Sequence, residues 1–472
     1  LISPAVPISK TFTITREIPD ITTSPVATTS IRPTTLADLT LQGGEASQPG
    51  IFVWTDSTTA LKLGEHAYSV TFIPTNAVTY GENIFNINIV LDNQQQYISW
   101  DIEDKDYYCG EIISLASARS KATANDAATG LQIVFTVDDE TLASIDGSEL
   151  TTLKTGTPKI TVGQPGNLTY LPAADVSKTI IIQPNVFTGE GGDDDWNNPA
   201  NWKAGVPTDE TPDASVKGDL TIQSDHKVNI FTIESGASVT IKNGATLTIK
   251  GSSAGRETYG DIIVENGGKL VIEETADSVC VQNVYLATSF GEHSSSQVIA
   301  ADRLTVHGDA FFDITWADNA NAQKWHAFTV PFPVDARKGI YDLDGNQLTN
   351  EVNYAIMSYH GDVRAQGKYG WAKFRNIMTP GTFYLMTVDG TIPTFRFRKT
   401  TEGNLAATNL LQVAQFPQSG DAQVTDAGWN GIGNSQLSYV SVDAPVQVLN
   451  PVSYTYELME ASSTNFTVGT PF

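Results

Sequence analysis

The sequence has few charged residues, only two cysteines and no long apolar run, and each shortage excludes a class of protein. Charged residues make up 17% of the 472, below the roughly 25% typical of soluble domains. Cys109 and Cys280 are too few for a cysteine-based zinc site. They fall in different predicted modules, so we do not expect a disulfide between them. No run of about 18 apolar residues occurs, which predicts that nothing spans a membrane.

Basic residues are outnumbered, because 28 Lys and Arg stand against 53 Asp and Glu for a net charge of −25. A surface this negative repels nucleic acid and anionic membranes, so we expect no nucleic-acid partner. The hydrophobic fraction of 40% supplies real cores and argues against disorder. The length predicts roughly three domains.

Periodicity of 3.6 residues is also scarce, whereas alternation with a period of two is widespread. Examples are residues 68–72, 85–91 and 395–397. Turn dipeptides recur between such segments, at Asp146-Gly147, Asn243-Gly244, Asn266-Gly267, Asp344-Gly345 and Asp389-Gly390. Alternation bounded by turn signals predicts strands, so the chain is expected to be all-β.

Two segments near the N-terminus carry related motifs. In the first, Gly50-Ile51-Phe52-Val53-Trp54 is followed by Tyr68-Ser69-Val70-Thr71-Phe72, Pro74 and Tyr80. This G-x-F-x-W and Y-x-V-x-F-x-P pattern resembles a bacterial immunoglobulin-like repeat. The second segment contains Ile98-Ser99-Trp100, residues 130–135 and residues 156–161, and resembles another such domain. The resemblance implies spacers and, in some members, adhesins.

A third segment contains paired apolar residues at matched offsets. The pairs are Leu220/Ile222 with Val228/Ile230, Val239/Ile241 with Leu247/Ile249, and Ile262/Val264 with Leu270/Ile272, and Val279/Val281 continues the series. The sets are shifted by 19 and then by 23 residues. Such a repeat predicts the stacked coils of a β-solenoid. The 23-residue shift also puts Lys242 beside Glu265 and Lys250 beside Glu273, which supports the register.

Two motifs flank this third segment. Upstream, Trp196 precedes Asn201-Trp202, Gly205 and Pro207. This N-W-x-x-G-x-P pattern resembles the segment that caps the first coil of many bacterial secreted β-helix proteins. Downstream lie Trp325 to Phe332 and then Gly428-Trp429-Asn430-Gly431-Ile432-Gly433-Asn434. This G-W-N-x-I-G-N motif resembles the β-rich C-terminal region of Bacteroidetes surface proteins, although Ser435 replaces the common proline.

The whole pattern resembles a modular, Bacteroidetes-type secreted surface protein. The expected fold class is all-β, with two immunoglobulin-like β-sandwiches, a short parallel β-solenoid and a C-terminal β-sandwich-like domain. The expected segments are 1–18 (the end of a preceding module or a linker), 19–93 and 94–185 (immunoglobulin-like domains), 186–311 (the capped β-helix) and 312–472 (the β-rich domain). The chain begins without Met, so we expect that a signal peptide or upstream domains were removed.

Two acidic segments suggest a metal hypothesis. Asp193, Asp194 and Asp195 offer the oxygen ligands that Ca²⁺ prefers, although a solvated acidic turn is the favoured alternative. Asp342-Leu343-Asp344-Gly345-Asn346 superficially resembles an EF-hand loop. Its Gly stands at position 4 instead of 6, so a hairpin turn is expected. Apart from Ca²⁺ at the acidic triplet, no cofactor is expected.

Aromatic and polar side chains offer the remaining candidate sites. Trp196 and Trp316 are candidates for stacking on a sugar, and His360 with Asp362 and Arg364 is a candidate polar binding site. A surface or structural histidine is the favoured alternative for His360. The other tryptophans fit core or cap positions, and they are Trp54, Trp100, Trp202, Trp325, Trp371 and Trp429. No H-E-x-x-H, G-x-S-x-G or P-loop pattern occurs, so no catalytic residue is predicted.

These observations favour a non-enzymatic protein with an architectural or adhesive role, secreted or on the outer cell surface. We expect a monomer that binds a host or matrix protein or a glycan. A glycan-binding surface protein of the same layout is the alternative. A β-helix polysaccharide lyase or glycosidase is the least favoured interpretation, because the aligned coils offer Lys–Glu pairs instead of converging carboxylates.

Overall fold

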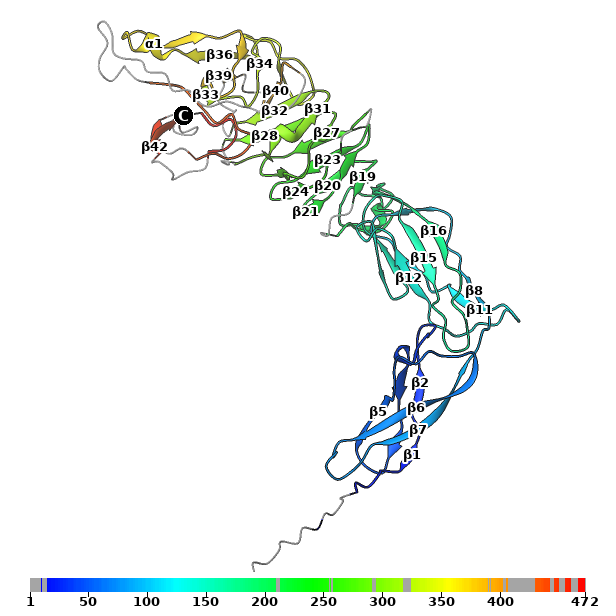
Figure 1. Cartoon of the computed structure of the whole chain (residues 1–472). Helices are drawn as coiled ribbons and strands as arrows, with labels where there is room; N and C mark the ends of the chain where they lie inside the picture. The colour runs from blue at the N-terminus through cyan, green and yellow to red at the C-terminus, as the bar shows by residue number, and fades with distance from the viewer. Residues whose placement is uncertain are drawn as a thin grey trace, which may run out of the picture. The chain divides into compact units, whose positions relative to one another are not determined.

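A computed structural model defines the fold. It describes residues 10, 15–208, 213–253, 255, 258–290, 294–316, 324–388, 390, 392–401, 405, 429–441, 445–449, 455–459 and 466–471. These residues are almost all strand and turn, as Figure 1 shows, which confirms the all-β class. No helix in these ranges is long and apolar enough to cross a membrane. Most of the predicted segment 1–18 lies outside the described residues.

The chain divides into two compact units. Unit 1 comprises Leu1–Lys105, Ile112–Thr151 and Thr157–Ile180. Unit 2 comprises Asp106–Glu111, Thr152–Gly156 and Ile181–Phe472. Three short pieces of the predicted 94–185 module therefore belong to unit 2, namely residues 106–111, 152–156 and 181–185.

The first module of unit 1 consists of antiparallel strands. They are β1 (Ile21–Thr23), β2 (Val26–Thr28), β3 (Thr40–Gln42), β4 (Glu45–Ala46), β5 (Gly50–Trp54), β6 (Gly64–Pro74) and β7 (Asn83–Leu91), with a 3₁₀ turn at Leu36–Asp38. Strands β5, β6 and β7 form one sheet, in which Phe52 pairs with Phe72. Tyr68 and Ile89 are buried against Leu36. The strands predicted at 68–72 and 85–91 are confirmed.

The second module of unit 1 continues with short antiparallel strands. They are β8 (Gln96–Ser99), β10 (Ile112–Ser114), β11 (Arg119–Ala122), β12 (Val134–Val137), β13 (Ala143–Asp146), β14 (Glu149–Thr152), β15 (Lys159–Gly163) and β16 (Val176–Thr179). Arg32 of the first module donates to the Asn167 carbonyl at 2.9 Å and to Asn93 Oδ1 at 3.0 Å. One guanidinium thus joins the two modules, because its planar fork reaches several acceptors at once.

Unit 2 contains stacked parallel strands. One stack is β20 (Leu220–Ile222), β23 (Ser238–Ile241), β25 (Asp261–Val264), β28 (Val284–Ser289) and β32 (Ala310–Thr315). A second is β21 (His226–Val228), β24 (Thr246–Ile249), β26 (Lys269–Ile272) and β30 (Gln297–Ile299). Two further parallel sheets are β18 (Asn185–Phe187), β19 (Ala214–Val216) and β22 (Phe231–Ile233), and β27 (Val279–Val281) with β31 (Leu304–Val306). Parallel strands of successive coils form the predicted short β-solenoid.

The register of the two central coils matches the prediction. Val239 pairs with Ile262, and Leu247 pairs with Leu270, each 23 residues on. All eight predicted core residues are at most 2% exposed: Val239, Ile241, Leu247, Ile249, Ile262, Val264, Leu270 and Ile272. Lys242 Nζ lies 2.7 Å from Glu265 Oε1, which confirms that ion pair. The Lys250–Glu273 pair stays a prediction.

Two details of the predicted register are wrong. Val228 pairs with Ile249 instead of Leu247, and Ile230 lies beyond the end of β21. Ile222 pairs with Ile241 and Val228 pairs with Ile249, so the connection between these paired positions is two residues shorter in the first coil than in the second. Val279 and Val281 pair with Leu304 and Val306 in a separate sheet, while Ile262 pairs with Val284.

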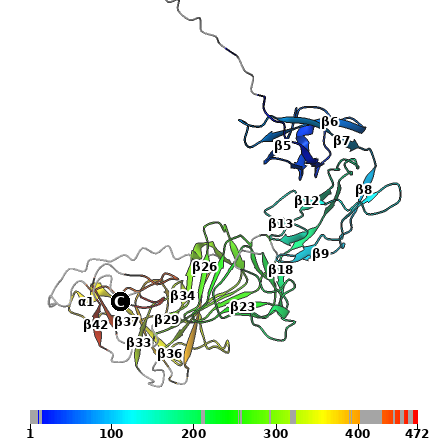
Figure 2. The ribbon, with the colours of Figure 1, turned by 90° about the horizontal axis from the view of Figure 1, so that it is seen from below.

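The C-terminal region continues the first stack with antiparallel strands. Strand β32 pairs with β40 (Thr394–Arg398), which pairs with β35 (Ile340–Tyr341). A second sheet has the order β33 (Trp325–Phe328), β39 (Tyr384–Val388), β36 (Tyr354–Tyr359), β37 (Trp371–Lys373). One hydrophobic core runs from Phe187 to Val468. Figure 2 shows β33 and β36 following the solenoid strands within unit 2. The predicted boundary at residue 311 falls inside β32.

Short elements complete the described residues. They are β9 (Asp106–Tyr108) with β17 (Ile181–Gln183), β29 (Ser294–Ser295), β34 (Val334–Asp335) with β38 (Ile377–Met378), β41 (Val446–Leu449) with β42 (Tyr456–Met459), 3₁₀ turns at Pro199–Asn201 and Ala301–Arg303, and the helical turn α1 (Gly361–Arg364).

In the G-W-N-x-I-G-N motif, Asn434 is buried and donates to the Phe466 carbonyl at 3.0 Å. Trp429 of the same motif is 44% exposed, so its prediction as a core anchor is wrong.

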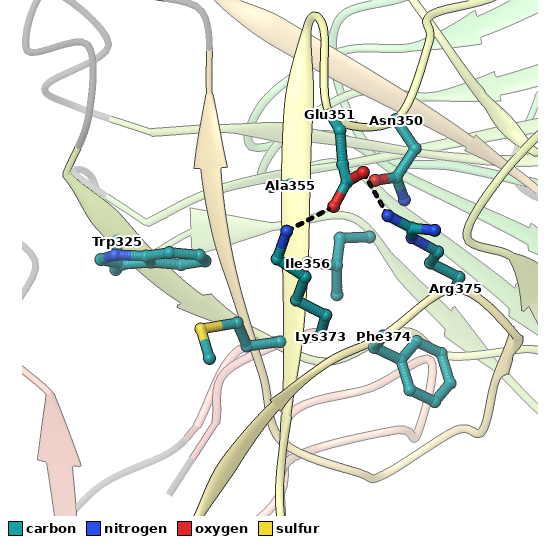
Figure 3. A pocket seen from close by; sticks show the side chains of 9 residues that line it. Trp325, Asn350, Glu351, Ala355, Ile356, Lys373, Phe374 and Arg375 are labelled. Atoms are coloured by element: carbon teal, nitrogen blue, oxygen red, sulfur yellow. Dashed lines mark hydrogen bonds and ion pairs between the residues drawn. The ribbon is translucent and has the colours of Figure 1, made fainter.

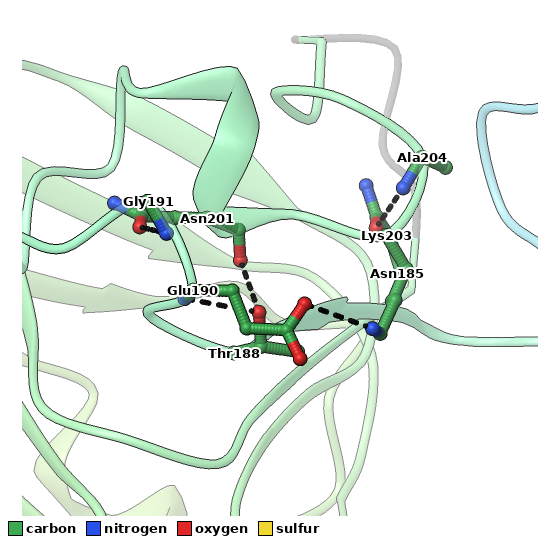
Figure 4. Close-up of polar contacts among 7 residues, drawn as sticks. All are labelled: Asn185, Thr188, Glu190, Gly191, Asn201, Lys203 and Ala204. Atoms are coloured by element: carbon green, nitrogen blue, oxygen red, sulfur yellow. Dashed lines mark hydrogen bonds and ion pairs between the residues drawn. The ribbon is translucent and has the colours of Figure 1, made fainter.

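Residues around the first coil of the solenoid are held by side-chain amides (Figure 4). Asn201 Oδ1 accepts from the Gly191 amide at 2.8 Å, and Asn185 Oδ1 accepts from the Ala204 amide at 3.1 Å. Trp202 is 5% exposed, and its ring centroid lies 5.3 Å from that of Phe187. The amides satisfy loop backbone groups, and the indole extends the core at this end.

Candidate functional site

The acidic triplet lies in the turn before the first coil, and its carboxylates already have donors. Asp193 accepts from Asn201 Nδ2 at 2.7 Å and from Asn198 Nδ2 at 3.0 Å. These amides hold the pKa of Asp193 below its usual range. Asp194 accepts from the Thr221 hydroxyl at 2.6 Å. In the described ranges, no group of three or more His, Cys, Asp or Glu is arranged to hold a metal ion.

Both tryptophans predicted to stack on sugars lie in the core. Trp196 is 0% exposed and Trp316 is 3% exposed. The Trp196 ring stacks on His226 with centroids 4.5 Å apart, and Trp316 lies 5.8 Å from Phe395. This corrects the expectation of a binding role, because packing covers the ring faces that a sugar would need.

The polar trio His360, Asp362 and Arg364 lies on and beside the helical turn α1. His360 and Asp362 are exposed, and Arg364 is half-buried. His360 Nε2 lies 3.0 Å from Ser358 Oγ. The three residues share one short segment, and the trio stays a prediction as a site.

Both cysteines are buried and free. Cys109 Sγ lies 3.9 Å from Thr155 Oγ1, and Asp213 accepts from the Thr155 amide at 2.9 Å. Burial, reinforced by the Asp213 charge, raises the pKa of the Cys109 thiol to about 11. Such a thiol stays protonated at neutral pH and is a packing group.

The loop 342–346 is a hairpin turn, as predicted, with Asp342 Oδ1 accepting from the Asn346 amide at 2.8 Å.

A pocket of about 180 Å³ opens on the sheet of strands β33, β39, β36 and β37 (Figure 3). Its lining residues are Trp325, Asn350, Glu351, Ala355, Ile356, Met357, Lys373, Phe374 and Arg375. Trp325 and Ala355 pair with Thr387 from opposite sides. Two strand spacings, about 10 Å, therefore separate their backbones.

A three-charge cluster forms the rim of this pocket. Glu351 Oε1 lies 2.9 Å from Lys373 Nζ, and its other oxygen bonds the Arg375 guanidinium. The two cations lower the pKa of Glu351 to about 2. Glu351 also has a φ of 65°, in the left-handed region that non-glycine residues rarely adopt. The ion pairs place its side chain at the pocket rim.

Comparisons with known proteins give only distant structural similarities. No family model matches the chain, and no curated protein matches it. Among solved structures, human protocadherin-24 EC1-2 is similar, with 9% identity and a TM-score of 0.15 over 34% of this chain and 99% of that one. Extracellular cadherin domains 3–6 of protocadherin gamma B2 match at 12% identity and a TM-score of 0.14, over 35% of this chain and 47% of that one. These scores carry no argument about function.

Sequence reasoning missed the pocket, although one signal was present. Trp325 was predicted to be a core anchor. Half-buried and buried residues alternate along strand β33, with Trp325 and Ala327 on its outer side. His326 and Phe328 are buried on the inner side. Alternation along one strand indicates that the two sides differ. It does not indicate that Glu351 and Arg375, which come from separate segments, line the same pocket as Trp325.

Proposed function

We propose that this protein is a non-enzymatic adhesion and architectural protein, secreted or on the outer surface of a bacterial cell. The observation that carries the proposal is the chemistry of the pocket. Glu351 provides the one carboxylate among the residues that line the pocket, and it forms ion pairs with two cations. Its pKa of about 2 keeps it ionised at neutral pH. A general acid or base needs a pKa near the working pH, so this arrangement suits binding.

The outer polar side chains of the solenoid support the same proposal. Asp261 accepts from Asn283 Nδ2 at 2.9 Å, and Asn283 accepts from the Asp309 amide at 2.8 Å. These residues lie on successive coils, so the contacts run along the stack and brace it. The motif resemblance to modular Bacteroidetes surface proteins and the strongly acidic surface fit an extracellular spacer that carries a binding region.

An array experiment tests the proposal. The full chain should bind a member of a panel of glycans and matrix proteins. It should release no reducing ends or unsaturated products from polysaccharides at neutral pH with Ca²⁺ added. Reproducible turnover that is lost when one Asp or Glu is changed would establish a lyase or glycosidase instead.

A further inference from the structure

The floor of the pocket is an apolar strip on the outer side of the sheet. Trp325, Ala355 and Met357 are half-buried and line it, and the buried Ile356 and the half-buried Phe374 also contribute to the lining. Phe374 is fixed by the Tyr384 ring, whose centroid lies 5.0 Å away. An indole with a partly open face beside small apolar groups suits the C–H-rich face of a sugar ring. The pocket volume of about 180 Å³ is close to that of one sugar ring.

The rim adds a local positive charge. Lys373 and Arg375 share the single carboxylate of Glu351, so the cluster carries a net charge of about +1 at neutral pH. The side chains of Lys373 and Arg375 are 75% and 54% exposed, so each retains donors that face solvent. An exposed guanidinium beside an apolar floor recognises a carboxylate well, because its fork can donate two parallel hydrogen bonds.

The negative net charge of the chain narrows the class of ligand further. The chain has a net charge of −25, which repels a densely charged polyanion at long range. A single carboxylate on a neutral carrier escapes most of this repulsion and still meets the cationic rim. The charge pattern therefore favours an isolated acidic group.

We propose that the pocket binds the single acidic sugar residue of an otherwise neutral glycan. The sugar ring lies against Trp325, and its carboxylate accepts from Arg375 and Lys373. Asn350 and Glu351 supply polar groups for ring hydroxyls. This inference rests on the proposed binding function and adds the class of ligand and the site.

Calorimetric titration of the full chain with 3′-sialyllactose and with lactose tests the inference. The charge-assisted contact to its carboxylate should make 3′-sialyllactose bind at least about tenfold more tightly than lactose. Trp325→Ala should abolish measurable binding of both probes. Arg375→Ala should lower the affinity for 3′-sialyllactose to that for lactose.

Matched controls separate the pocket from its surroundings. Trp371→Ala removes a half-buried indole from the same sheet outside the pocket, and Arg337→Ala removes an exposed guanidinium elsewhere in the region. Both should leave the two affinities unchanged, and thermal melting verifies that every variant is folded.

Each contrary result has a distinct meaning. Equal affinity for the two probes, or equal losses in Trp325→Ala and Trp371→Ala, would overturn the inference. Tighter, Arg375-dependent binding of a short acidic peptide would replace the glycan with a protein ligand. Array binding that survives Trp325→Ala leaves the proposed function standing while the pocket loses its role. Turnover of the probe would overturn the proposed function itself.

Discussion

The solenoid strands and the C-terminal sheets share one core but fill it with different side chains. Aliphatic residues such as Ile241 and Leu270 fill the interior of the parallel stacks, at positions that recur along the chain. Aromatic residues such as Phe328 and Phe397, from distant segments, fill the interior beyond β32. The aliphatic core repeats from coil to coil, whereas the aromatic core supports a sheet whose outer side carries the pocket.

Core truncations on the two sides of β32 test whether the shared core unfolds as one body. Phe397→Ala should cost about 3–5 kcal/mol and Ile241→Ala about 2–5 kcal/mol, because both side chains are 0% exposed. Both variants should lower the temperature of the same unfolding transition in scanning calorimetry of the full chain. Ile263→Ala, on the half-buried outer side of β25, should cost less. Shifts in two different transitions would show that the core is divided.

Loss of an indole at the first coil should be nearly as harmful. Trp202→Ala should cost about 3–5 kcal/mol, because the ring is buried against Phe187 and Trp196. Lys203→Ala, next to it but without a buried ring, is the control for thermal melting. An unchanged melting temperature in the Trp202 variant would refute its role in closing the solenoid.

Close packing of the coils can be tested at a glycine. A Cβ on Gly260 would lie 2.4 Å from the backbone oxygens of Ala237 and Glu234, so Gly260→Ala should cost roughly 1–3 kcal/mol. Gly236→Ala meets nothing within 4 Å, and its φ of 85° makes the cost about 1 kcal/mol through backbone strain alone. Chemical unfolding compares the two variants. If Gly260→Ala is the milder change, the coils have more room than the structure shows.

The smallest expected effect concerns pH and the pocket rim. The pKa of Glu351 is about 2 in the folded protein against an ordinary value of 4.5. Its contribution to stability is therefore complete above about pH 4.5 and is lost as the pH falls through 2. Glu351→Gln should reduce the loss of melting temperature between these pH values. An identical pH dependence in variant and parent would contradict the ion-pair geometry.

The sequence alone determined the all-β class and the register of the central coils. Periodicity was sufficient there because each coil repeats the same two inward positions, so Val239 and Ile262 align wherever the repeat length is kept. It was insufficient where a turn changed length, as at Val228, because register depends on turn geometry as well as on pattern. It also misplaced Trp196 and Trp316, since residue type alone does not reveal which aromatic rings the fold covers.

Only the tertiary structure decided the pocket and the continuous core. Trp325, Glu351 and Arg375 come from a strand and two turns that antiparallel pairing brings together, and no short motif links them. Strand β40 lies against β32 although about eighty residues separate them. Such contacts depend on long-range pairing, whose partners are chosen by the summed packing of the whole core and not by the local sequence.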